Sequence, residues 1–384
     1  MTDRALRIGV VSTIYPSRSN PASGIFVKEE LDALSTTVDI RLLAPRPNHR
    51  WFSERGYGCG KADYPVRRPF VFAFPRFFYQ RLYPLSLAMT LRLHGRRFFA
   101  ECDCIHAHNV FAEGVAAVQA FGQSRPVVVT AHGSDINHFA CKPDLNPGII
   151  SAMNDAAHII CVSNALERSI GELGISTPAT VIPNGIDTSF LRSGPKEDAC
   201  GELGLDPDRP RLLFAGNFVH VKGVEYLLDA VPELKRRVPG CELILIGSGP
   251  LEKTYRERIH SLGIGTAVRI HPRVDHRDLA AWYQASDVFV LPSIAEGFGL
   301  VAAEALACGR PVVATVSGGP EDIVGEGDGV LVPARNSAAL ADGIVRVIER
   351  QGIRTPGELS ASAMARFSYD LLALRIRDVY ERIL

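Results

Sequence analysis

Short apolar segments rich in Val and Ile recur along this chain, each followed by a segment of helical character. They are apolar throughout, as strands are when helices cover both faces of a sheet. Their alternation with helices predicts βαβ units in an open α/β sheet. In the first half we expect strands at Arg7–Thr13, Asp39–Ala44, Val71–Phe74, Cys104–His106, Val127–Thr130, His158–Val162 and Thr180–Ile182. In the second half we expect them at Arg211–Ala215, Glu242–Ile246, Val268–Ile270, Val288–Leu291, Pro311–Thr315 and Gly329–Val332.

A polar stretch between Phe190 and Pro210 separates the two series of strands. It predicts a domain boundary, with a first domain over 1–190 and a second over 191–365. Each half, at roughly 180 residues, is long enough for a doubly wound Rossmann-like domain. Ligands of such folds bind beyond the carboxyl ends of the strands, so the default active site is a cleft between the two domains. The end of the chain, Ala365–Leu384, is expected to be a helix with Ser368 as a possible cap.

Composition narrows the class of protein. The 384 residues contain 42 Lys plus Arg and 42 Asp plus Glu, so no net field attracts nucleic acid. Eight cysteines are scattered without a CxxC pair, which favours reduced thiols in a cytoplasmic protein. The N-terminus shows no signal-peptide pattern, and no apolar run reaches about 18 residues, so no membrane-spanning helix is expected.

The segment Ser293–Val313 is the most informative in the chain. A strand ends near Pro292, Gly297 and Gly299 form a turn that lets the backbone approach a ligand, and a helix begins at about Leu300. Exposed N–H groups and the helix dipole make such a helix start suitable for a pyrophosphate. Glu296 and Glu304 flank this start, and carboxylates suit sugar hydroxyls. From spacing alone, a capped helix with a solvated Glu304 is an equal alternative.

Two further glycine-bearing loops follow strands in the same half. Gly216 ends one strand, and Lys222 then precedes an amphipathic helix, where it could neutralise a diphosphate leaving group. Gly247 and Gly249 follow the next strand. An ordinary surface lysine is the simpler alternative for Lys222 taken alone. Three such loops after successive strands nevertheless predict a nucleotide cleft.

At this point the sequence resembles a known family, the retaining glycosyltransferases of the GT-B fold, family four. The pair Glu296/Glu304 in EGFGLVAAEALACGRPVVA carries the resemblance. The first half is most similar to the exopolysaccharide and teichuronic-acid-type members. Further matching motifs are GIFV (24–27), HAHN (106–109), TAHGSD (130–135), VSNAL (162–166), IPNGID (182–187), KG (222–223), GSGP (247–250) and SGGPEDIV (317–324).

The resemblance implies roles for the donor-side residues. Glu304 would bind the donor ribose, Glu296 would hold hydroxyls of the transferred sugar, and Lys222 would meet the diphosphate. Backbone amides of Phe298, Gly299 and Leu300 would lie nearby. The donor would be a nucleotide-sugar, which we expect to be a UDP-sugar, with no further cofactor and no metal. One position departs from the family pattern, because Asn217 stands where an Arg is usual, and His220 or Arg273 could compensate for that loss.

The resemblance also implies roles on the acceptor side. His132 would lie beside the donor sugar and contribute to catalysis, and Asp135 would orient His132 or the acceptor. The loop at Gly24 would cover the phosphates or the acceptor. His106 and His108 are assigned to the same acceptor side, since they share one strand face. The final helix, 366–384, would return to the first domain and pack on it.

Four histidines in the first half, His106, His108, His132 and His138, also suggest a metal site. Neutral histidines at strand ends more often form hydrogen bonds, and a typical zinc site needs further ligands, so no metal is expected. The only DxD sequence, Asp206-Pro207-Asp208, lies in the polar linker and is expected to be a turn.

By resemblance, transfer retains the anomeric configuration and the leaving diphosphate accepts the acceptor proton, so no general base is assigned. The acceptor is a hydroxyl of a glycan, a lipid-linked or a small molecule. A hydrolase with paired carboxylates is disfavoured, because Glu296 sits in a phosphate-type loop. A UDP-sugar 2-epimerase and a non-catalytic nucleotide-sugar-binding subunit stay open as alternatives.

Residues 64–100 contain seven Arg, ten aromatic residues and no acid. Part of this stretch could form a basic amphipathic helix that contacts an anionic membrane carrying a lipid-linked acceptor. A pair of ordinary helices with Arg side chains that extend to the solvent is the alternative.

Overall fold

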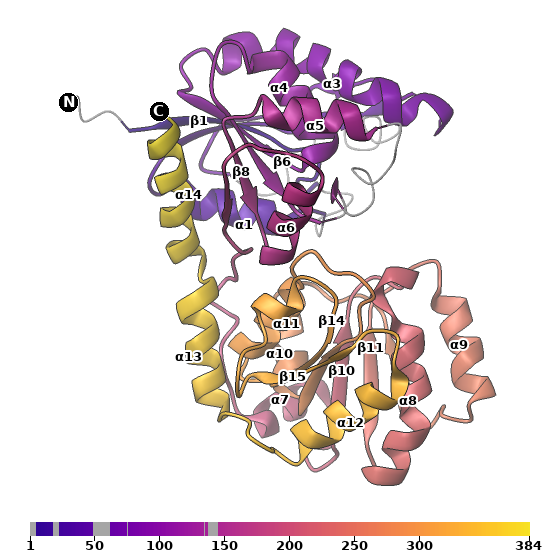
Figure 1. Ribbon diagram of the computed structural model, residues 1–384. Helices are drawn as coiled ribbons and strands as arrows, with labels where there is room; N and C mark the ends of the chain where they lie inside the picture. The colour runs from indigo at the N-terminus through magenta and orange to yellow at the C-terminus, as the bar shows by residue number, and fades with distance from the viewer. Residues whose placement is uncertain (1–4, 18–22, 49–61, 75, 134, 137–144) are drawn as a thin grey trace. The chain divides into compact units, whose positions relative to one another are not determined.

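The computed structural model describes residues 5–17, 23–48, 62–74, 76–133, 135–136 and 145–384 (Figure 1). The chain forms two compact units. One comprises the residues up to Gly185 together with Tyr369–Leu384, and the other comprises Ile186–Ser368. The chain therefore leaves the first unit once and re-enters it at the C-terminal helix.

The first unit is built on a seven-stranded parallel sheet in the order β4-β2-β1-β6-β7-β8-β9. Its strands are β1 (Arg7–Val11), β2 (Asp39–Leu43), β4 (Val66–Arg67), β6 (Cys104–His108), β7 (Val127–Ala131), β8 (His158–Cys161) and β9 (Ala179–Val181). Two short strands, β3 (Arg46–Pro47) and β5 (Phe70–Val71), pair in a separate two-stranded ladder. The central strands β6, β7 and β8 are buried along their whole length, which is why they read as continuous apolar segments.

Helices cover both faces of this sheet (Figure 1). They are α1 (Ile25–Leu34), α3 (Arg76–Phe98), α4 (Val115–Phe121), α5 (Asn146–Asn154), α6 (Asn164–Glu172) and α14 (Tyr369–Ile383). The helix α4 packs against both α3 and α5, and α1 packs against α14. Leu372, Ile376 and Tyr380 of α14 share a buried cluster with Ile8 and Val10 of β1. The last helix of the chain is thus part of the core of the first unit.

The second unit has a six-stranded parallel sheet in the order β12-β11-β10-β13-β14-β15. Its strands are β10 (Arg211–Ala215), β11 (Glu242–Ile246), β12 (Val268–His271), β13 (Val288–Leu291), β14 (Val312–Val316) and β15 (Gly329–Pro333). Because all pairings are parallel, the carboxyl ends of these strands lie along one edge of the sheet. The loops that follow β10, β11 and β13 at this edge carry the residues of the candidate site.

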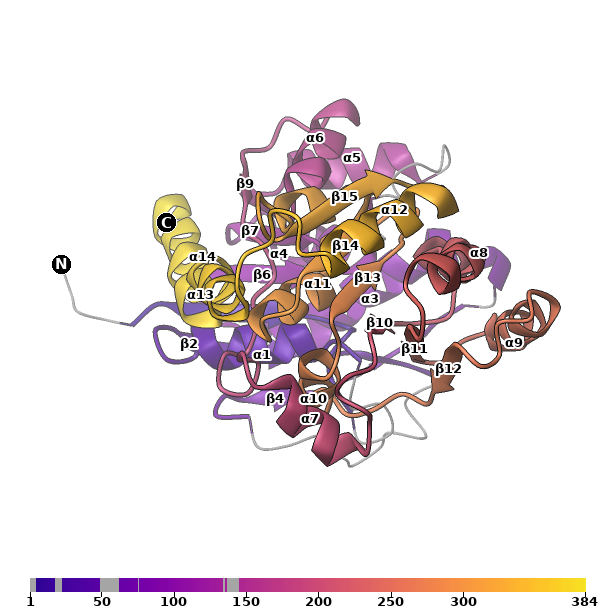
Figure 2. The same ribbon diagram turned by 90° about the horizontal axis from the view of Figure 1, so that it is seen from below.

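Figure 2 shows α8 and α12 on one face of this sheet, with α7, α10 and α11 on the other. The helices are α7 (Lys196–Leu203), α8 (Val224–Arg237), α9 (Glu252–Ser261), α10 (Leu279–Gln284), α11 (Leu300–Ala307), α12 (Ser337–Ile348) and α13 (Pro356–Phe367). The helix α13 packs against α11. These helix layers on both faces of the sheet follow from the alternation of strands and helices in the sequence. The α/β class that the sequence predicted is confirmed.

Three local expectations were wrong. The segment 71–74 does not form a strand of the main sheet, because only Phe70–Val71 is extended and it pairs with β3. The edge strand β4, two residues long, was not expected. The last helix does not run unbroken from Ala365, because Ser368 adopts an extended conformation (φ −61°, ψ 139°) and separates α13 from α14. Two-residue strands and a single extended residue give no periodic signal in a sequence.

Candidate functional site

The turn between β13 and α11 gives the site its frame. Gly299 has φ 93°, and a Cβ there would lie 2.9 Å from Cδ2 of Leu291, so the tight turn requires glycine. The backbone of Glu296 pairs with the loop after β14, since its N–H donates to Ser317 O and its carbonyl accepts from Gly319, both at 2.9 Å. No side chain caps the start of α11, and its first turn contains no acidic residue. The helix begins at Leu300, as the sequence predicted, and its N-terminal amides suit an anion.

Lys222 lies beside this turn and contacts one of the glutamates. Its Nζ donates to Oε2 of Glu296 over 2.6 Å, and Oγ of Ser293 donates to the same oxygen over 2.9 Å. Gly223, at φ 61°, sets the position of the lysine, because a Cβ there would lie 2.1 Å from Pro292 O. The side chains of Lys222 and Glu296 are 23% and 13% exposed. Lys222 is therefore not an ordinary surface lysine but half of a partly shielded ion pair.

Glu304 is buried inside α11 rather than solvated. Its side chain is 3% exposed, Oε1 lies 2.7 Å from Nε2 of His276, and Oε2 accepts from Tyr283 OH over 2.8 Å. Burial and the neighbouring carboxylate raise the pKa of Tyr283 well above its usual value, so the phenol stays a donor. The solvated alternative for Glu304 is excluded. Both of its oxygens already accept a hydrogen bond, and His276 and Tyr283 were not identified from the sequence.

The two remaining glycine loops pack on each other. A Cβ on Gly247 would lie 1.9 Å from the carbonyl oxygen of Gly216, and one on Gly249 would lie 2.5 Å from Phe218 O. The protein's own backbone thus explains why Gly247 and Gly249 are glycines. Beside them, the guanidinium of Arg273 donates to Oδ1 of Asn217.

His220, the other residue expected to compensate for Asn217, faces elsewhere. Its Nδ1 lies 2.8 Å from Oε1 of Glu225, and its side chain is 72% exposed. Of the two cations considered, Arg273 is the one that the structure brings to Asn217.

In the first unit, three histidines meet at the ends of β6 and β7. His106 has both ring nitrogens engaged, with Nδ1 2.7 Å from Tyr380 OH and Nε2 2.7 Å from Oγ1 of Thr130. Its ring lies against that of His108, with centroids 4.5 Å apart. Nδ1 of His108 lies 3.2 Å from Nε2 of His132. The structure brings together all three histidines that were singled out from the described residues; His138 lies outside them.

Burial keeps this histidine group neutral. Desolvation lowers the pKa of His106 to about 3 and that of His132 to about 4, and it lowers the pKa of His108 well below the usual value. At neutral pH each ring therefore offers one N–H donor and one acceptor nitrogen. Which nitrogen carries the proton is set by the hydrogen-bond partners.

Asp135 shapes the turn after β7. Its carboxylate accepts hydrogen bonds from four backbone amides, those of Val110 (2.8 Å), His132 (3.3 Å), Gly133 (2.7 Å) and Ile136 (3.1 Å), and the residue is 1% exposed. Asp135 therefore holds the backbone of the turn that carries His132. Gly24 begins α1 at φ 66°, and a Cβ there would lie 2.0 Å from Ile14 O, so this glycine serves close packing with the turn after β1.

One group of buried residues has the composition of a metal site. Potential ligand atoms of Glu30, His106 and His108 all lie within 4.8 Å of one another. Both nitrogens of His106 are already hydrogen-bonded, which leaves only Glu30 and His108 from this trio, fewer than the ligands of a structural zinc site. The Asp206–Asp208 segment forms a turn in which the amide of Asp208 donates to Oδ1 of Asp206 over 3.0 Å.

Most of the basic aromatic stretch forms the helix α3, which has Pro84 within it, and the first part of the stretch contains β4 and β5. One side of this helix is exposed, and we call it the α3 stripe. Its members recur at helical spacing and are Phe78, Arg81, Leu85, Met89, Arg92, Leu93 and Arg96. Phe78, Leu85, Met89 and Leu93 are 59%, 54%, 65% and 74% exposed. None of the described helices is both long enough and apolar enough to cross a bilayer.

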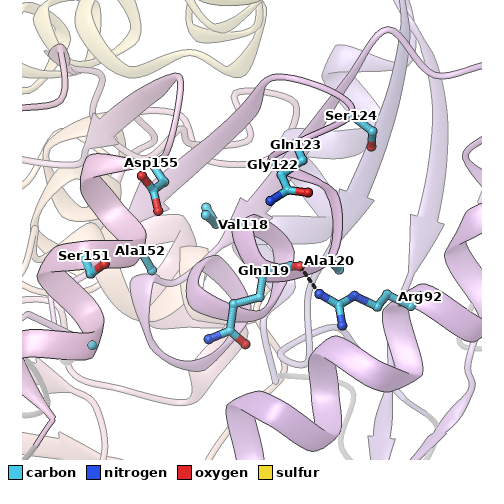
Figure 3. A pocket seen from close by; sticks show the side chains of 11 residues that line it. Arg92, Val118, Gln119, Ala120, Gly122, Gln123, Ser124, Ser151, Ala152 and Asp155 are labelled. Carbon is cyan, nitrogen blue, oxygen red and sulfur yellow. Dashed lines mark hydrogen bonds between the residues drawn. The ribbon is translucent and has the colours of Figure 1, made fainter.

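Two pockets adjoin the α3 stripe. Their lining residues include none of the predicted donor-site or acceptor-site residues. One, of about 750 Å³, lies among α3, α4 and α5, with Arg92 at its rim (Figure 3). The guanidinium of Arg92 donates to the carbonyl of Gln119, and the side chains of Ser151 and Asp155 line the other side. The second, of about 210 Å³, is lined by Arg81 and Leu85 of the stripe and by Ile149.

Comparison with known families divides the chain in two. Residues 24–190 match the model of glycosyltransferase family 4, and residues 196–363 match that of glycosyl transferases group 1. A D-inositol 3-phosphate glycosyltransferase of Xylanimonas cellulosilytica is 32% identical over 317 residues, covering 76% of this chain and 75% of that protein. The putative teichuronic acid biosynthesis glycosyltransferase TuaC of Bacillus subtilis is 27% identical over 402 residues, covering 98% of this chain and 99% of TuaC.

Solved structures share the fold over the full chain. Sucrose-phosphate synthase from Thermosynechococcus elongatus superposes with a TM-score of 0.81 at 23% identity, over 98% of this chain and 99% of that one. Anabaena HepE in complex with UDP has a TM-score of 0.74 at 22% identity, over 98% of this chain and 100% of that one. The two Rossmann-like units predicted from the sequence therefore occur in other proteins of known structure.

Proposed function

The chain belongs to the glycosyltransferases of group 1 and family 4, and on that premise we propose that it moves a sugar from a UDP-sugar to a hydroxyl acceptor with retention of the anomeric configuration. The second unit would hold the donor and the first would receive the acceptor. HepE, which shares the fold, has been solved with UDP and with UDP-glucose, which supports a uridine donor. The proposal needs no metal ion.

The observation that carries the donor assignment is the pair Lys222–Glu296 beside the uncapped start of α11. A diphosphate placed at Leu300 would meet helix amides and a lysine ammonium, the two kinds of group that stabilise a departing phosphate. As Lys222 turned to the phosphates, Glu296 would lose its salt bridge and keep the hydrogen bond from Ser293. Its carboxylate would then accept hydrogen bonds from sugar hydroxyls. Donor binding would thus exchange one partner of Glu296 for another.

Glu304 is the proposed contact for the donor ribose, and the structure refines how it would act. Each carboxylate oxygen can accept more than one hydrogen bond, so ribose hydroxyls would share Oε1 with His276. The side chain of His276 is 22% exposed and has room to move, whereas Tyr283 is fully buried. Tyr283 would hold the carboxylate in place while His276 adjusts to the sugar.

On the acceptor side we assign catalysis to His132, with Asp135 orienting its backbone. A neutral histidine can donate a hydrogen bond to a sugar or phosphate oxygen and leave the leaving diphosphate to take the acceptor proton. This division suits same-face attack, in which the protein orients the substrates and stabilises charge. His106 and His108 lie behind His132 and would support it without touching the substrate.

We further propose that the acceptor is carried at an anionic membrane, with the α3 stripe as the contact. Four exposed apolar side chains could enter the boundary between headgroups and acyl chains, while Arg81, Arg92 and Arg96 would meet phosphates. No acidic residue occurs from Tyr64 to Ala100, so nothing in this stretch opposes an anionic surface. The protein would act as a peripheral membrane enzyme in the cytoplasm. The six described cysteines, all buried and unpaired, are consistent with that reducing compartment.

A thermal-shift series tests the donor assignment directly. UDP-, GDP- and ADP-sugars are added to the full chain, and the UDP-sugar is expected to raise the melting temperature most, because a ligand stabilises the native state by mass action. Lys222→Ala is expected to lose that shift and most transfer activity, and Glu296→Ala to lose transfer while both variants stay folded. Lys253→Ala is the matched control, since Lys253 lies in the same unit and its side chain is 89% exposed. Wild-type turnover in Lys222→Ala would refute the site.

A further inference from the structure

The histidine group of the first unit contains three polar atoms without a hydrogen-bond partner. They are Oε1 of Glu30, Nε2 of His108 and Nδ1 of His132; all three are shielded from solvent, and none has a partner among the residues that the structure describes. Such atoms are costly to bury unless they are paired. Glu30 and His108 are 8% and 0% exposed, so no bulk water satisfies them.

Two of these atoms face each other, and the third ends a continuous path. Oε1 of Glu30 lies 3.6 Å from Nε2 of His108, and Nδ1 of His108 lies 3.2 Å from Nε2 of His132. The rings of His108 and His132 are inclined by only 16°. The path therefore runs from Glu30 on α1, through His108 on β6, to Nδ1 of His132 after β7.

We propose that Glu30 and His108 are positioning residues that determine whether His132 presents a donor or an acceptor at Nδ1. This rests on the proposed role of His132 in transfer. The ligand at Nδ1 would be an oxygen of the substrate, either a sugar hydroxyl or a phosphate. Glu30 and His108 would not touch it.

The state of Glu30 fixes where each proton lies along the path. If Glu30 is protonated, it donates to Nε2 of His108, whose proton must then be on Nδ1. That Nδ1–H donates to Nε2 of His132, so the proton of His132 is on Nδ1, at the end of the path, where it can act as a donor. If Glu30 is ionised, each ring carries its proton on Nε2 instead, and Nδ1 of His132 becomes an acceptor. The two states differ by the one proton of Glu30, and both rings stay neutral.

The surroundings favour the protonated state. Burial raises the pKa of Glu30 to about 8, and among the described residues no cation lowers it again. The groups that face the path are His106 and Cys104 from β6, Asp135 from the turn after β7, and Tyr380 from α14. Of these only Asp135 is a charge, and its carboxylate is occupied by four backbone amides. At neutral pH, His132 would therefore present an N–H donor.

Imidazole ¹⁵N NMR on the full chain tests the inference without any substrate, since protonated and bare ring nitrogens resonate far apart. His132 is assigned by comparison with His132→Asn. In the wild type we expect the proton on Nδ1 at pH 7 and a shift to the Nε2–H tautomer as the pH rises through about 8. In Glu30→Gln, whose amide donates to His108 without titrating, His132 should keep one tautomer from pH 6 to 9.

Glu113→Gln is the matched control. Glu113 is also a buried carboxyl of the first unit with a raised pKa, but it accepts from Thr13 and lies outside the path. It should leave the pH-dependent tautomer change of His132 intact. If His132 shows the same tautomer in wild type and Glu30→Gln at every pH, or if purified protein holds one zinc per chain at Glu30 and His108, the inference is overturned. Transfer activity of His132→Asn tests a different claim. If this variant kept wild-type transfer, the catalytic role of His132 would be refuted, but the inference about its tautomer would stand.

Discussion

At the scale of single residues, the sequence identified the charged groups but not their partners. Glu296, Lys222 and Glu304 were found because they sit next to glycines and a helix start. Ser293, His276 and Tyr283 were missed, although they supply hydrogen bonds to Glu296 or Glu304. A serine at the end of a strand or a tyrosine in an apolar helix carries no signal of its own. Only the folded chain shows that these side chains converge on a carboxylate.

Asn217 gives a prediction at this scale, because we propose that a neighbouring arginine replaces the one expected at this position. The family usually has an arginine there, and here the guanidinium of Arg273 reaches Asn217 from the loop after β12. We expect Arg273→Ala to lower kcat/KM by roughly 10²-fold, because one charge-assisted donor to the diphosphate would be lost.

A second substitution, Asn217→Arg, makes the prediction for Arg273 specific. Adding Asn217→Arg to Arg273→Ala should restore most of the lost activity, since it returns the guanidinium from the other loop. Arg256→Ala, which removes an exposed arginine paired with Glu252, is the control and should keep wild-type kinetics. Steady-state kinetics with varied donor measure all three. Full activity of Arg273→Ala alone would contradict the assignment.

At the scale of elements, continuous apolar segments predicted the central strands, because these strands are covered on both faces. β10, β11 and β13 begin and end at the residues expected from the sequence. The predictions of secondary structure were wrong at positions where a strand is buried on one side or where the backbone of one residue ends a helix. Examples are the edge strand β4 and Ser368 between α13 and α14. The exposed side of α3 could be anticipated only as an excess of arginine and aromatic residues. Which of these face the solvent is a property of packing against α4.

The α3 stripe gives a prediction at this scale. The protein should float with liposomes that contain anionic lipid and not with purely zwitterionic ones, and high salt should weaken the binding because it screens the arginines. The double substitution Met89→Asp with Leu93→Asp should abolish flotation, since it removes the two most exposed apolar side chains of the stripe and adds negative charge.

A control of the same chemistry is available on another helix. Leu374 of α14 is 56% exposed but lies outside the stripe, so Leu374→Asp should leave flotation unchanged. Equal binding by the wild type and the Met89/Leu93 variant would show that α3 does not contact the membrane. Circular dichroism would confirm that each variant is folded.

At the scale of the whole molecule, the buried histidines link stability to pH. Their folded-state pKa values are depressed, so the unfolded chain binds more protons, and the stabilisation present above pH 6.5 is lost as the pH falls toward 3 or 4. At pH 5, His106 should reduce the free energy of unfolding by about 2 kcal/mol relative to pH 6.5, and His108 acts in the same direction. Glu30 acts in the opposite sense, because its raised pKa favours the folded state at low pH and this contribution is lost as the pH rises through about 8.

Together these groups predict a maximum of stability near pH 6.5. Urea unfolding followed at pH 5, 6.5 and 8.5 measures it, with the free energy expected to be lower at both extremes. Glu30→Gln should flatten the decline on the alkaline side and steepen the rise between pH 5 and 6.5, since it removes a carboxyl that titrates between 4.5 and about 8 and leaves the histidines. An unfolding free energy that stays constant from pH 5 to 8.5 would mean that the histidines are not buried in solution.

The path of the chain through its two units has a consequence for how the protein can be divided. Because α14 completes the core around β1, a fragment ending at Gly185 would lack the side chains of Leu372, Ile376 and Tyr380 from its interior. The segment Ile186–Ser368, by contrast, is an uninterrupted insertion that contains its own sheet. Ribosomal synthesis must therefore pass α14 before the first unit can close, while the inserted unit can acquire its structure earlier.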